Sequence, residues 1–236
     1  GRIDFDKYSQ IRENLAFCRY DYDTNAEVYS IENRTASKVL PLTEDNCTLM
    51  GKMEDGSIIE GEHNITNSPK KIVDVYYKED PEVNKEVIKK IKEADLIILS
   101  MGSLYTSIIC NLVCKDIIDA IDSSNAKVLH VCNMFTQPGE TDDYDVSKHI
   151  EVLNSYLGNK KIDLVIANNG KIKKEFLVKY HRKEQKDPVI IDKAIKENKN
   201  IKLIEADFTI VDDGTLKHDS IKLSLKIFEE LINESR

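Results

Sequence analysis

Two clusters of small and polar residues each follow a short apolar run, and together they could bind an anionic ligand. Residues 100–103 follow the apolar run at 95–99, and residues 133–141 follow the run at 127–132. Short, β-rich apolar runs that end abruptly in polar residues are typical of buried parallel strands. Ligands of open α/β sheets bind beyond the carboxyl ends of such strands. We therefore expect both clusters to face one crevice that determines the function.

The first cluster combines a glycine with hydroxyl groups at the start of a helix expected over residues 107–121. Gly102 allows the backbone to approach a ligand, and the hydroxyls of Ser103 and Thr106 lie where free amides suit an anion. The alternative is ordinary N-capping of the helix by the same hydroxyls. Tyr105 either fills a packing gap or presents a flat ring to a base or sugar.

The second cluster is denser in hydrogen-bonding groups. Pro138 and Gly139 predict a turn in which the glycine is free to take positive φ. A plain surface turn seldom needs so many polar side chains after a buried strand, which favours a ligand role over a capping network for a helix at 145–157. The polar residues are Asn133, Thr136, Gln137, Glu140, Thr141, Asp142 and Asp143. The carboxylates, Asp142 above all, could hold Mg²⁺ through water or could favour the helix start.

Strands and helices are expected to alternate around these clusters. Strands are expected at 72–77, 95–99, 127–132, 163–167, 189–192 and 202–206, and helices at 82–94, 107–121, 145–157, 172–183 and 218–234. The last helix carries on one face Ile221, Leu225, Phe228, Leu231 and Ile232. This alternation predicts a Rossmann-like, three-layer α/β/α fold with a mainly parallel sheet. In addition to this fold, we expect a small β-hairpin that turns at Asp55 and Gly56.

The composition is that expected of a cytoplasmic domain with one core. With 41% apolar content, 236 residues can bury on the order of 70% of the unfolded surface. A net charge of -8 opposes nucleic-acid binding, which needs a basic footprint. We expect no membrane insertion, because no apolar run approaches the roughly 20 residues that span a bilayer. Five cysteines without CxxC spacing predict buried thiols rather than disulfides or a metal pair.

Long strings around the two clusters resemble the bacterial gluconeogenesis factor (YvcK) family, relatives of the archaeal CofD phospholactate transferases. ADLIILSMGSLYTSIICNL and VCNMFTQPGETDDYDVSKHI carry the resemblance, and it continues in family order through KVLPLTEDNCTLMGKMEDGSIIEGEHNI, FLVKYHRKEQKDPVIID and IEADFTIVDDGTLKHDSIKL. We therefore expect a CofD-like α/β domain over residues 33–236. The family begins with a strand and a GGGTG-like loop that residues 1–32 lack, so the domain is expected to be without that unit. Residues 4–18 instead predict an unmatched amphipathic helix.

The resemblance also implies a nucleotide-sugar site. In the family, the tyrosine before the PV-V-D segment and the basic residue before His-Asp contact a nucleotide sugar, and these positions are Tyr180 and Lys217 here. Asn64, after the hairpin, corresponds to a residue near that site. Lys217 stands in place of the usual arginine, which keeps a point charge but loses a bidentate contact with phosphate. Asp143 stands where the family usually has glycine.

Two functions are compatible with the resemblance. The first is a regulatory protein that binds a UDP-sugar such as UDP-GlcNAc, or another nucleotide, and affects carbon metabolism, cell shape and envelope growth. The second is a transferase that moves a phospholactyl-type group from a nucleotide-linked donor with Mg²⁺. We favour the first, because TQPGETD belongs to the bacterial branch and no general base is evident from spacing. A homo-oligomer is compatible with either function, as is a degenerate fragment without ligand.

Overall fold

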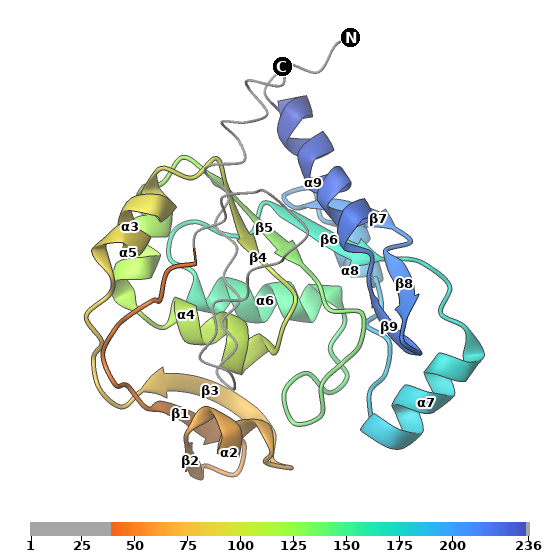
Figure 1. Ribbon diagram of the computed structural model, residues 1–236, viewed down its shortest axis with the longest axis horizontal. Coiled ribbons are helices and arrows are strands. Elements are labelled where there is room, and N and C mark those ends of the chain that lie inside the picture. Colours follow the sequence, from red (N-terminus) through yellow and green to blue (C-terminus); the bar gives the residue numbers. More distant parts are fainter. Residues whose placement is uncertain (1–38, 235–236) are drawn as a thin grey trace.

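Four parallel strands form the central sheet of the computed structural model, which describes residues 39–234 (Figure 1). They are β4 (Leu96–Leu99), β5 (Lys127–Val131), β6 (Leu164–Asn168) and β7 (Lys202–Ala206), and their order in the sheet is their order in the chain. All three pairings are parallel. The predicted strands at these positions are therefore confirmed, and all four carboxyl ends lie along one edge.

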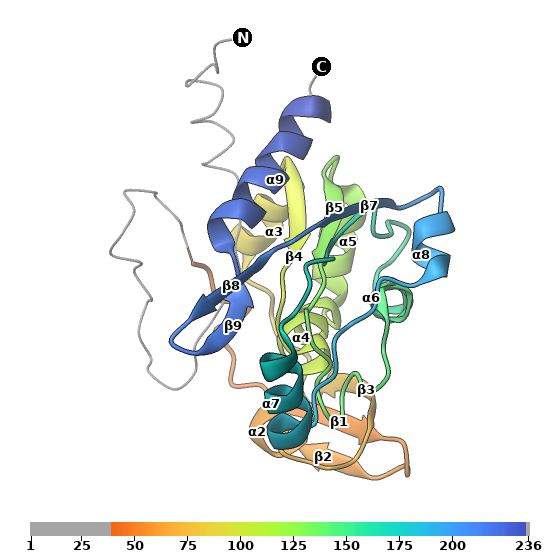
Figure 2. The same ribbon diagram turned by 90° about the vertical axis from the view of Figure 1, so that its right-hand side faces the viewer.

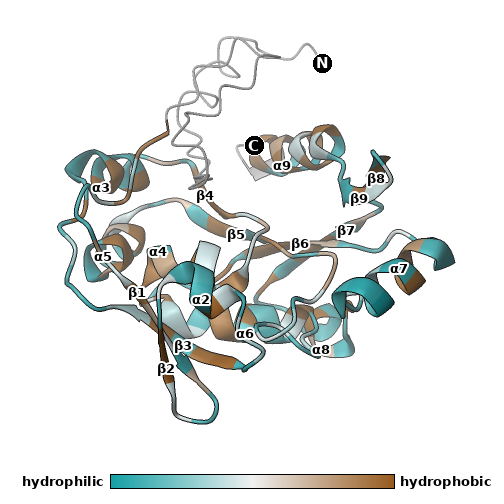
Figure 3. Ribbon diagram, turned by 60° about the horizontal axis from the view of Figure 1, so that its bottom comes forward, coloured by the Kyte–Doolittle hydropathy of each residue, from teal (hydrophilic) through white to brown (hydrophobic). Residues whose placement is uncertain are grey.

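Helices cover both faces of this sheet, so the three-layer prediction is confirmed (Figures 2 and 3). One face carries α5 (Lys115–Ser123), α6 (Val146–Tyr156) and α8 (Lys193–Glu197), with α3 (Lys85–Lys92) beside α5, and the other carries α9 (Ser220–Glu234). Val128 and Val165 point into the first core, whereas Leu129 and Ile166 pack with Leu223 of α9. Adjacent strand residues enter opposite cores because side chains alternate across a sheet.

A separate antiparallel sheet has the order β2-β1-β3 and lies below the parallel sheet in Figure 1. It consists of β1 (Leu49–Met53), β2 (Ile58–Glu60) and β3 (Ile72–Tyr77). The predicted hairpin is confirmed, and Gly56 in its turn has a φ of 81°. β3 was expected among the parallel strands, but it pairs with β1. Only Ile72 and Val75 of β3 are buried, which fits a strand with one solvated face.

The helix expected at 107–121 is divided. A π-helix, η1 (Leu104–Ile109), leads into α4 (Cys110–Leu112), and α5 begins only after an extended residue, Cys114. The Cys114 carbonyl accepts hydrogen bonds from the amides of Ile117 and Ile118, so it starts a new helix. Apolar residues continue across the break, which is why periodicity did not reveal it. The helix expected at 82–94 is also shorter, because the side chain of Asn84 caps α3.

The C-terminal third departs most from the prediction. Residues 189–192 form no ladder with the described strands, and the extended chain there makes one isolated bridge, Phe135 to Pro188, before the short helix α8. α7 (Lys174–Glu184) is confirmed, but the hairpin of β8 (Thr209–Asp212) and β9 (Thr215–His218) was not predicted. Asp213 and Gly214 turn this hairpin at positive φ values of 46° and 66°.

α9 faces the sheet largely with a different side from the one expected, and of the predicted apolar face Leu231 packs against the core. Leu223 and Ile227 are buried, whereas Ile221 and Leu225 are 73% and 63% exposed. Glu230 is also buried, and it pairs with Lys202 of β7. The segment predicted as an amphipathic helix at 4–18 lies outside the described residues. Within residues 39–234, no helix combines the length and apolar character needed to cross a bilayer.

Candidate functional site

The loops after β4 and β5 meet at the carboxyl edge of the sheet, as expected from the sequence. The amide of Gly102 donates to Oδ1 of Asn133 over 3.1 Å, and Nδ2 of Asn133 donates to the carbonyl of Gly102 over 2.6 Å. This reciprocal pair of hydrogen bonds fixes the first loop on the second. Gly102 and Asn133 thus form the rim of this edge of the sheet. Both polar atoms of the Asn133 side-chain amide are used in this contact.

The buried carboxylate of Glu140 occupies the start of η1, where an anionic ligand was expected. The Ser103 hydroxyl lies 2.7 and 2.6 Å from its two oxygens, and the Tyr105 amide donates over 3.2 Å. Nε2 of Gln137 donates to the same carboxylate over 2.9 Å. Because Glu140 is only 1% exposed, the anion at this helix start is the protein's own side chain.

Capping, the alternative for the first hydroxyl cluster, is also observed. The amide of Thr106 donates to Oγ of Ser103 over 3.2 Å. Burial raises the pKa of Glu140, the nearby Glu62 carboxylate raises it further, and the bonds from Ser103 and Tyr105 act in the opposite direction. A carboxylate so enclosed by donors holds the two loops together rather than facing a substrate.

Thr136 and Thr141 stabilise the second loop from inside. The Thr136 amide donates to the carbonyl of Asp187 over 2.7 Å, and Oγ1 of Thr136 accepts from the Asp187 amide over 3.0 Å. Oγ1 of Thr141 accepts from the amide of Gln137 over 2.8 Å. Both threonines are buried, so their hydroxyls serve the loop itself.

The predicted Pro-Gly turn packs against the antiparallel sheet. Gly139 has a φ of 80°, and its carbonyl accepts from the Ile72 amide at the start of β3 over 2.8 Å. Oδ2 of Asp142 accepts from the Gly139 amide over 2.8 Å. Asp143 has a φ of 59°, a conformation that favours glycine.

Gly139→Ala is expected to lower the free energy of unfolding by about 2 to 3 kcal/mol. A β-carbon there would lie 3.1 Å from the Ser68 carbonyl oxygen and 3.2 Å from that of Lys70, at an unfavourable φ. Gly56→Ala is the matched control, because Gly56 has a similar φ of 81° and a β-carbon there would meet no described atom within 4 Å. Urea unfolding should give the control a loss of only about 1 kcal/mol. Equal losses would contradict the packing role of Gly139.

Tyr105 is a core residue rather than a ring at a loop crest. It is buried, and its hydroxyl lies 3.5 Å from that of Tyr144. Burial, followed by the contact with Tyr144, raises the pKa of Tyr105. A hollow of about 250 Å³ beside the two rings is also lined by Tyr156 and Lys148. The ring of Tyr105 is therefore not presented to the edge where the strands end.

Tyr180 is joined to the second loop, whereas Lys217 is turned away from it. The buried ring of Tyr180 lies 4.6 Å from that of Phe135, and its hydroxyl accepts from the Leu216 amide over 3.1 Å. The exposed Lys217 ammonium pairs with Asp212 over 2.7 Å. Since residues alternate along β9, Lys217 lies on the face opposite Leu216 and His218.

Asn64 lies on the short helix α2 (Glu62–Thr66), at the side of η1. Its side-chain amide donates to the carbonyl of Glu60 over 2.8 Å, and the residue is exposed. The contact between α2 and η1 runs through the hydroxyls of Thr66 and Thr106, which are 3.4 Å apart. Asn64 thus flanks the joined loops, and its side-chain amide is bonded to its own segment rather than to their rim.

The turn after β6 contributes residues that sequence reasoning left out of the site. Oδ1 of Asn168 accepts from the Phe208 amide over 2.9 Å, which brings the ends of β6 and β7 together. Exposed Lys171 and Lys173 follow, and Lys173 precedes α7 without capping it through its side chain. His218 reaches the same edge through a bond to the Cys132 backbone, and burial lowers its pKa. The polar Asn-Asn-Gly sequence at residues 168–170, at the end of a strand, could have indicated that this turn belongs to the site.

The described residues do not fit the Mg²⁺ site considered for Asp142. One of its carboxylate oxygens already accepts from Gly139. Residues 39–234 hold no group of three or more histidine, cysteine, aspartate or glutamate side chains arranged to bind a metal ion. Cys114 is buried as predicted, whereas Cys110 is half-buried and its Sγ donates to the carbonyl of Thr106 over 3.1 Å.

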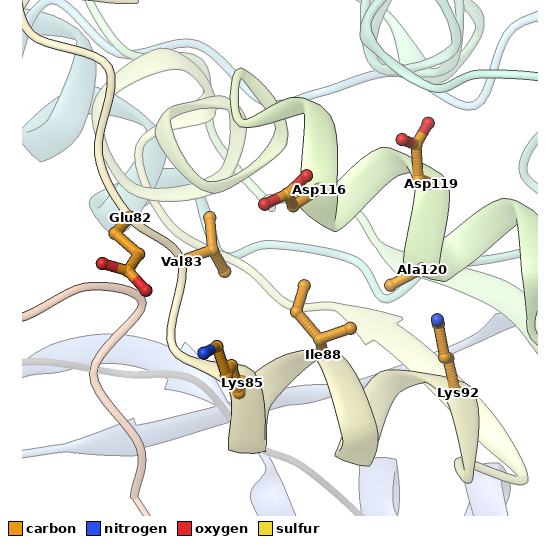
Figure 4. A pocket seen from close by; sticks show the side chains of 8 residues that line it. All are labelled: Glu82, Val83, Lys85, Ile88, Lys92, Asp116, Asp119 and Ala120. Carbon is orange, nitrogen blue, oxygen red and sulfur yellow. The ribbon is translucent and has the colours of Figure 1, made fainter.

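A second hollow lies away from the predicted residues, between α3 and α5 (Figure 4). It has a volume of about 420 Å³, and Val83, Ile88 and Ala120 form its apolar lining. Lysines of α3 face aspartates of α5 across it. Opposite charges on the two helices give this groove no net preference for an anionic ligand.

Comparison with known proteins identifies the family. The family model described as 2-phospho-L-lactate transferase CofD matches residues 23–209. The chain belongs to the CofD family. Within this family it is 42% identical over 193 residues to a putative gluconeogenesis factor of Thermotoga maritima, covering 79% of this chain and 60% of that protein. It is 36% identical over 204 residues to a putative gluconeogenesis factor of Clostridium acetobutylicum, covering 84% of this chain and 45% of the relative.

The fold of this CofD family member is also that of a solved relative. The crystal structure of a Bacillus halodurans protein superposes with a TM-score of 0.77 at 34% identity, covering 82% of this chain and 62% of the other. The chain thus spans roughly half to three fifths of the length of the relatives it matches. The resemblance to the gluconeogenesis factor family, which the sequence motifs indicated, is therefore confirmed.

Proposed function

We propose that this CofD family member binds a nucleotide sugar of the UDP-GlcNAc type at the carboxyl edge of the β4–β7 sheet. In this proposal it acts as a regulatory binding protein that affects carbon metabolism, cell shape and envelope growth. The names of the relatives, gluconeogenesis factor, support the regulatory part. The resemblance and the chemistry of this edge support the proposed ligand class.

The observation that carries the proposal is the polarity of this edge. The rim built by Gly102 and Asn133 lies at the ends of β4 and β5, and the exposed Lys171 and Lys173 follow β6. Two lysines beside the uncapped start of α7 suit a diphosphate, because helix amides and ammonium groups both stabilise negative charge. The buried carboxylate of this edge, Glu140, is committed to internal donors, which favours binding over acid-base catalysis.

Isothermal titration of the chain with UDP-GlcNAc, UDP and GDP tests the proposal. Saturable binding that is tightest for UDP-GlcNAc is expected, and Lys171→Ala with Lys173→Ala should weaken it by roughly tenfold per lysine, the loss of one charge-assisted contact each. Lys78→Ala is a control on the antiparallel sheet, where Lys78 pairs with Glu60. Absence of binding to all three nucleotides would refute the proposal.

Lys217→Ala tests the residue that the resemblance assigns to the site. Its side chain is 54% exposed and that of Lys78 is 55% exposed, and each pairs with one carboxylate, so the two variants remove similar groups. We expect Lys217→Ala to weaken nucleotide binding less than the lysines after β6, because Lys217 faces away from the edge. An effect as large as theirs would mean that the β8–β9 hairpin contributes directly to the ligand site.

A transferase of the CofD type is the second candidate, and the matched family model favours it. It would transfer a phospholactyl-type group from a nucleotide-linked donor. Incubation of the protein with such a donor, an acceptor and Mg²⁺, followed by detection of the transferred product, separates the two functions. Turnover would replace the regulatory proposal with an enzymatic one.

A further inference from the structure

The hollow beside Tyr105 is a candidate for a second ligand site, away from the carboxyl edge of the sheet. It lies between β3 and α6, next to η1, and has a volume of about 250 Å³. Tyr105, Tyr144 and Tyr156 line it together with Lys71 and Lys148, and we call it the tyrosine hollow. It is smaller than the pockets of about 300 to 1,000 Å³ that take drug-sized molecules, so it suits a ligand of about one ring.

Two buried hydroxyls of the tyrosine hollow share a single long contact. Tyr105 and Tyr144 are 3% and 9% exposed, and their hydroxyl oxygens lie 3.5 Å apart, beyond the usual separation of about 2.7 to 2.8 Å for an O–H···O hydrogen bond. Each hydroxyl has one proton to donate, and burial raises the pKa of Tyr105, which keeps its proton in place. Within residues 39–234, at most one of the two protons has an acceptor. An occupant with acceptor oxygens would satisfy the other.

The charges that line the tyrosine hollow favour an anion. Lys71 and Lys148 are its charged lining residues, and none of the described residues that line it carries a carboxylate. Glu151 pairs with Lys148 over 2.7 Å, and Asp74 accepts from the Tyr156 hydroxyl over 2.6 Å, so these neighbouring carboxylates already have partners. The groove between α3 and α5 differs, because aspartates and lysines both line it. Acceptor oxygens that carry negative charge therefore suit the tyrosine hollow best.

We propose that the tyrosine hollow binds a small aromatic carboxylate, at a site separate from the one proposed for the nucleotide sugar. The carboxylate of this ligand accepts hydrogen bonds from the hydroxyls of Tyr105 and Tyr144 and is attracted by the Lys148 ammonium. Its ring contacts the tyrosine rings and the side chains of Val73 and Val152, which belong to the apolar part of the lining. Val73 is 43% exposed, so this wall of the hollow reaches the surface.

Isothermal titration of the full chain with benzoate, benzyl alcohol and acetate tests this site. Benzoate should bind saturably with a Kd at or below about 1 mM, and the other two compounds, which lack the charge or the ring, should bind about tenfold more weakly or worse. Tyr144→Phe removes a hydroxyl and keeps the ring, so it should weaken benzoate binding by about tenfold. Tyr76→Phe is the matched control, because Tyr76 lies on β3 but is 41% exposed and does not line the hollow. Absence of saturable benzoate binding, or equal effects of the two substitutions, would overturn the proposal.

Two further variants locate the bound benzoate. Lys148→Met keeps the aliphatic chain and removes the charge, so it should weaken the binding of benzoate but not that of benzyl alcohol. Lys171→Ala with Lys173→Ala should leave benzoate binding unchanged, because these lysines lie at the carboxyl edge. Loss of benzoate binding in the double variant would place the anion at that edge and overturn the proposal. Benzoate binding by a chain that binds no nucleotide would support the tyrosine hollow and refute only the nucleotide site.

Discussion

Glu140→Ala is expected to lower the free energy of unfolding by about 4 kcal/mol, the largest effect that we predict for a single substitution. The carboxylate is 1% exposed and accepts hydrogen bonds from Ser103, Tyr105 and Gln137. Its removal leaves these donors buried beside a cavity. Because Ser103 and Tyr105 belong to the loop after β4 and Gln137 to the loop after β5, the variant should loosen the join between the two. Urea unfolding monitored by circular dichroism measures the loss.

Glu140→Gln and Glu62→Ala are the comparisons for this result. Glutamine keeps one acceptor oxygen but turns an NH₂ group toward existing donors, so we expect roughly half the loss, about 2 kcal/mol. Glu62 is a nearby, exposed carboxylate, and its truncation should cost much less. A loss below about 1 kcal/mol for Glu140→Ala would show that the carboxylate does not hold the loops.

Stability is expected to fall by about 1 to 3 kcal/mol between pH 7.5 and pH 5.5 because of two buried histidines. His130 and His149 are buried, their rings lie 6.4 Å apart, and Nε2 of each has no hydrogen-bond partner among residues 39–234. Burial, followed by the proximity of His149, lowers the pKa of His130 to about 3, and burial lowers the pKa of His149.

The sign follows from proton uptake by the unfolded chain. Its histidines bind protons as the pH falls through about 6.5, whereas His130 stays neutral and His149 takes up a proton only at a lower pH than in the unfolded chain. The stability present above pH 6.5 is therefore lost as the pH falls, by up to about 1.4 kcal/mol per pH unit for each histidine. The raised pKa of Glu140 acts in the opposite direction, because the folded state then takes up a proton more readily than the unfolded chain.

Substitutions of single histidines separate their contribution to the pH dependence of stability from that of Glu140. His149→Gln should flatten the slope of stability against pH between 7.5 and 5.5, because it removes the contribution of one of the two paired histidines. His63→Gln should leave the slope unchanged, since His63 is exposed. Chemical unfolding at several pH values gives the three slopes, and identical slopes for the wild type and His149→Gln would contradict the role assigned to this pair.

The strands of the parallel sheet could be predicted from the sequence, because each is marked by an apolar run. β4, β5 and β6 were evident because a strand buried on both faces must be apolar along its length. The meeting of Gly102 with Asn133 then followed from the parallel arrangement, since carboxyl ends share one edge. The β8–β9 hairpin was missed although Asp213 and Gly214 provide the same turn signal as Asp55 and Gly56.

The roles of individual polar residues could not be predicted in the same way. Composition shows that hydrogen-bonding groups are needed at Ser103, Thr136 and Glu140, but not whether their partners are ligand atoms or protein atoms. The structure pairs these three with the protein. The buried face of α9 was misassigned for a related reason: the helix has apolar residues on two sides, and periodicity alone does not distinguish the side that meets the sheet.

Hydrogen exchange of the backbone amides, measured by mass spectrometry with and without saturating UDP-GlcNAc, tests the ligand site most directly. We predict slower exchange in residues 100–103, 132–137 and 168–173, at the carboxyl ends of β4, β5 and β6. Unchanged exchange in these three segments, or protection confined to the groove between α3 and α5, would contradict the proposed site.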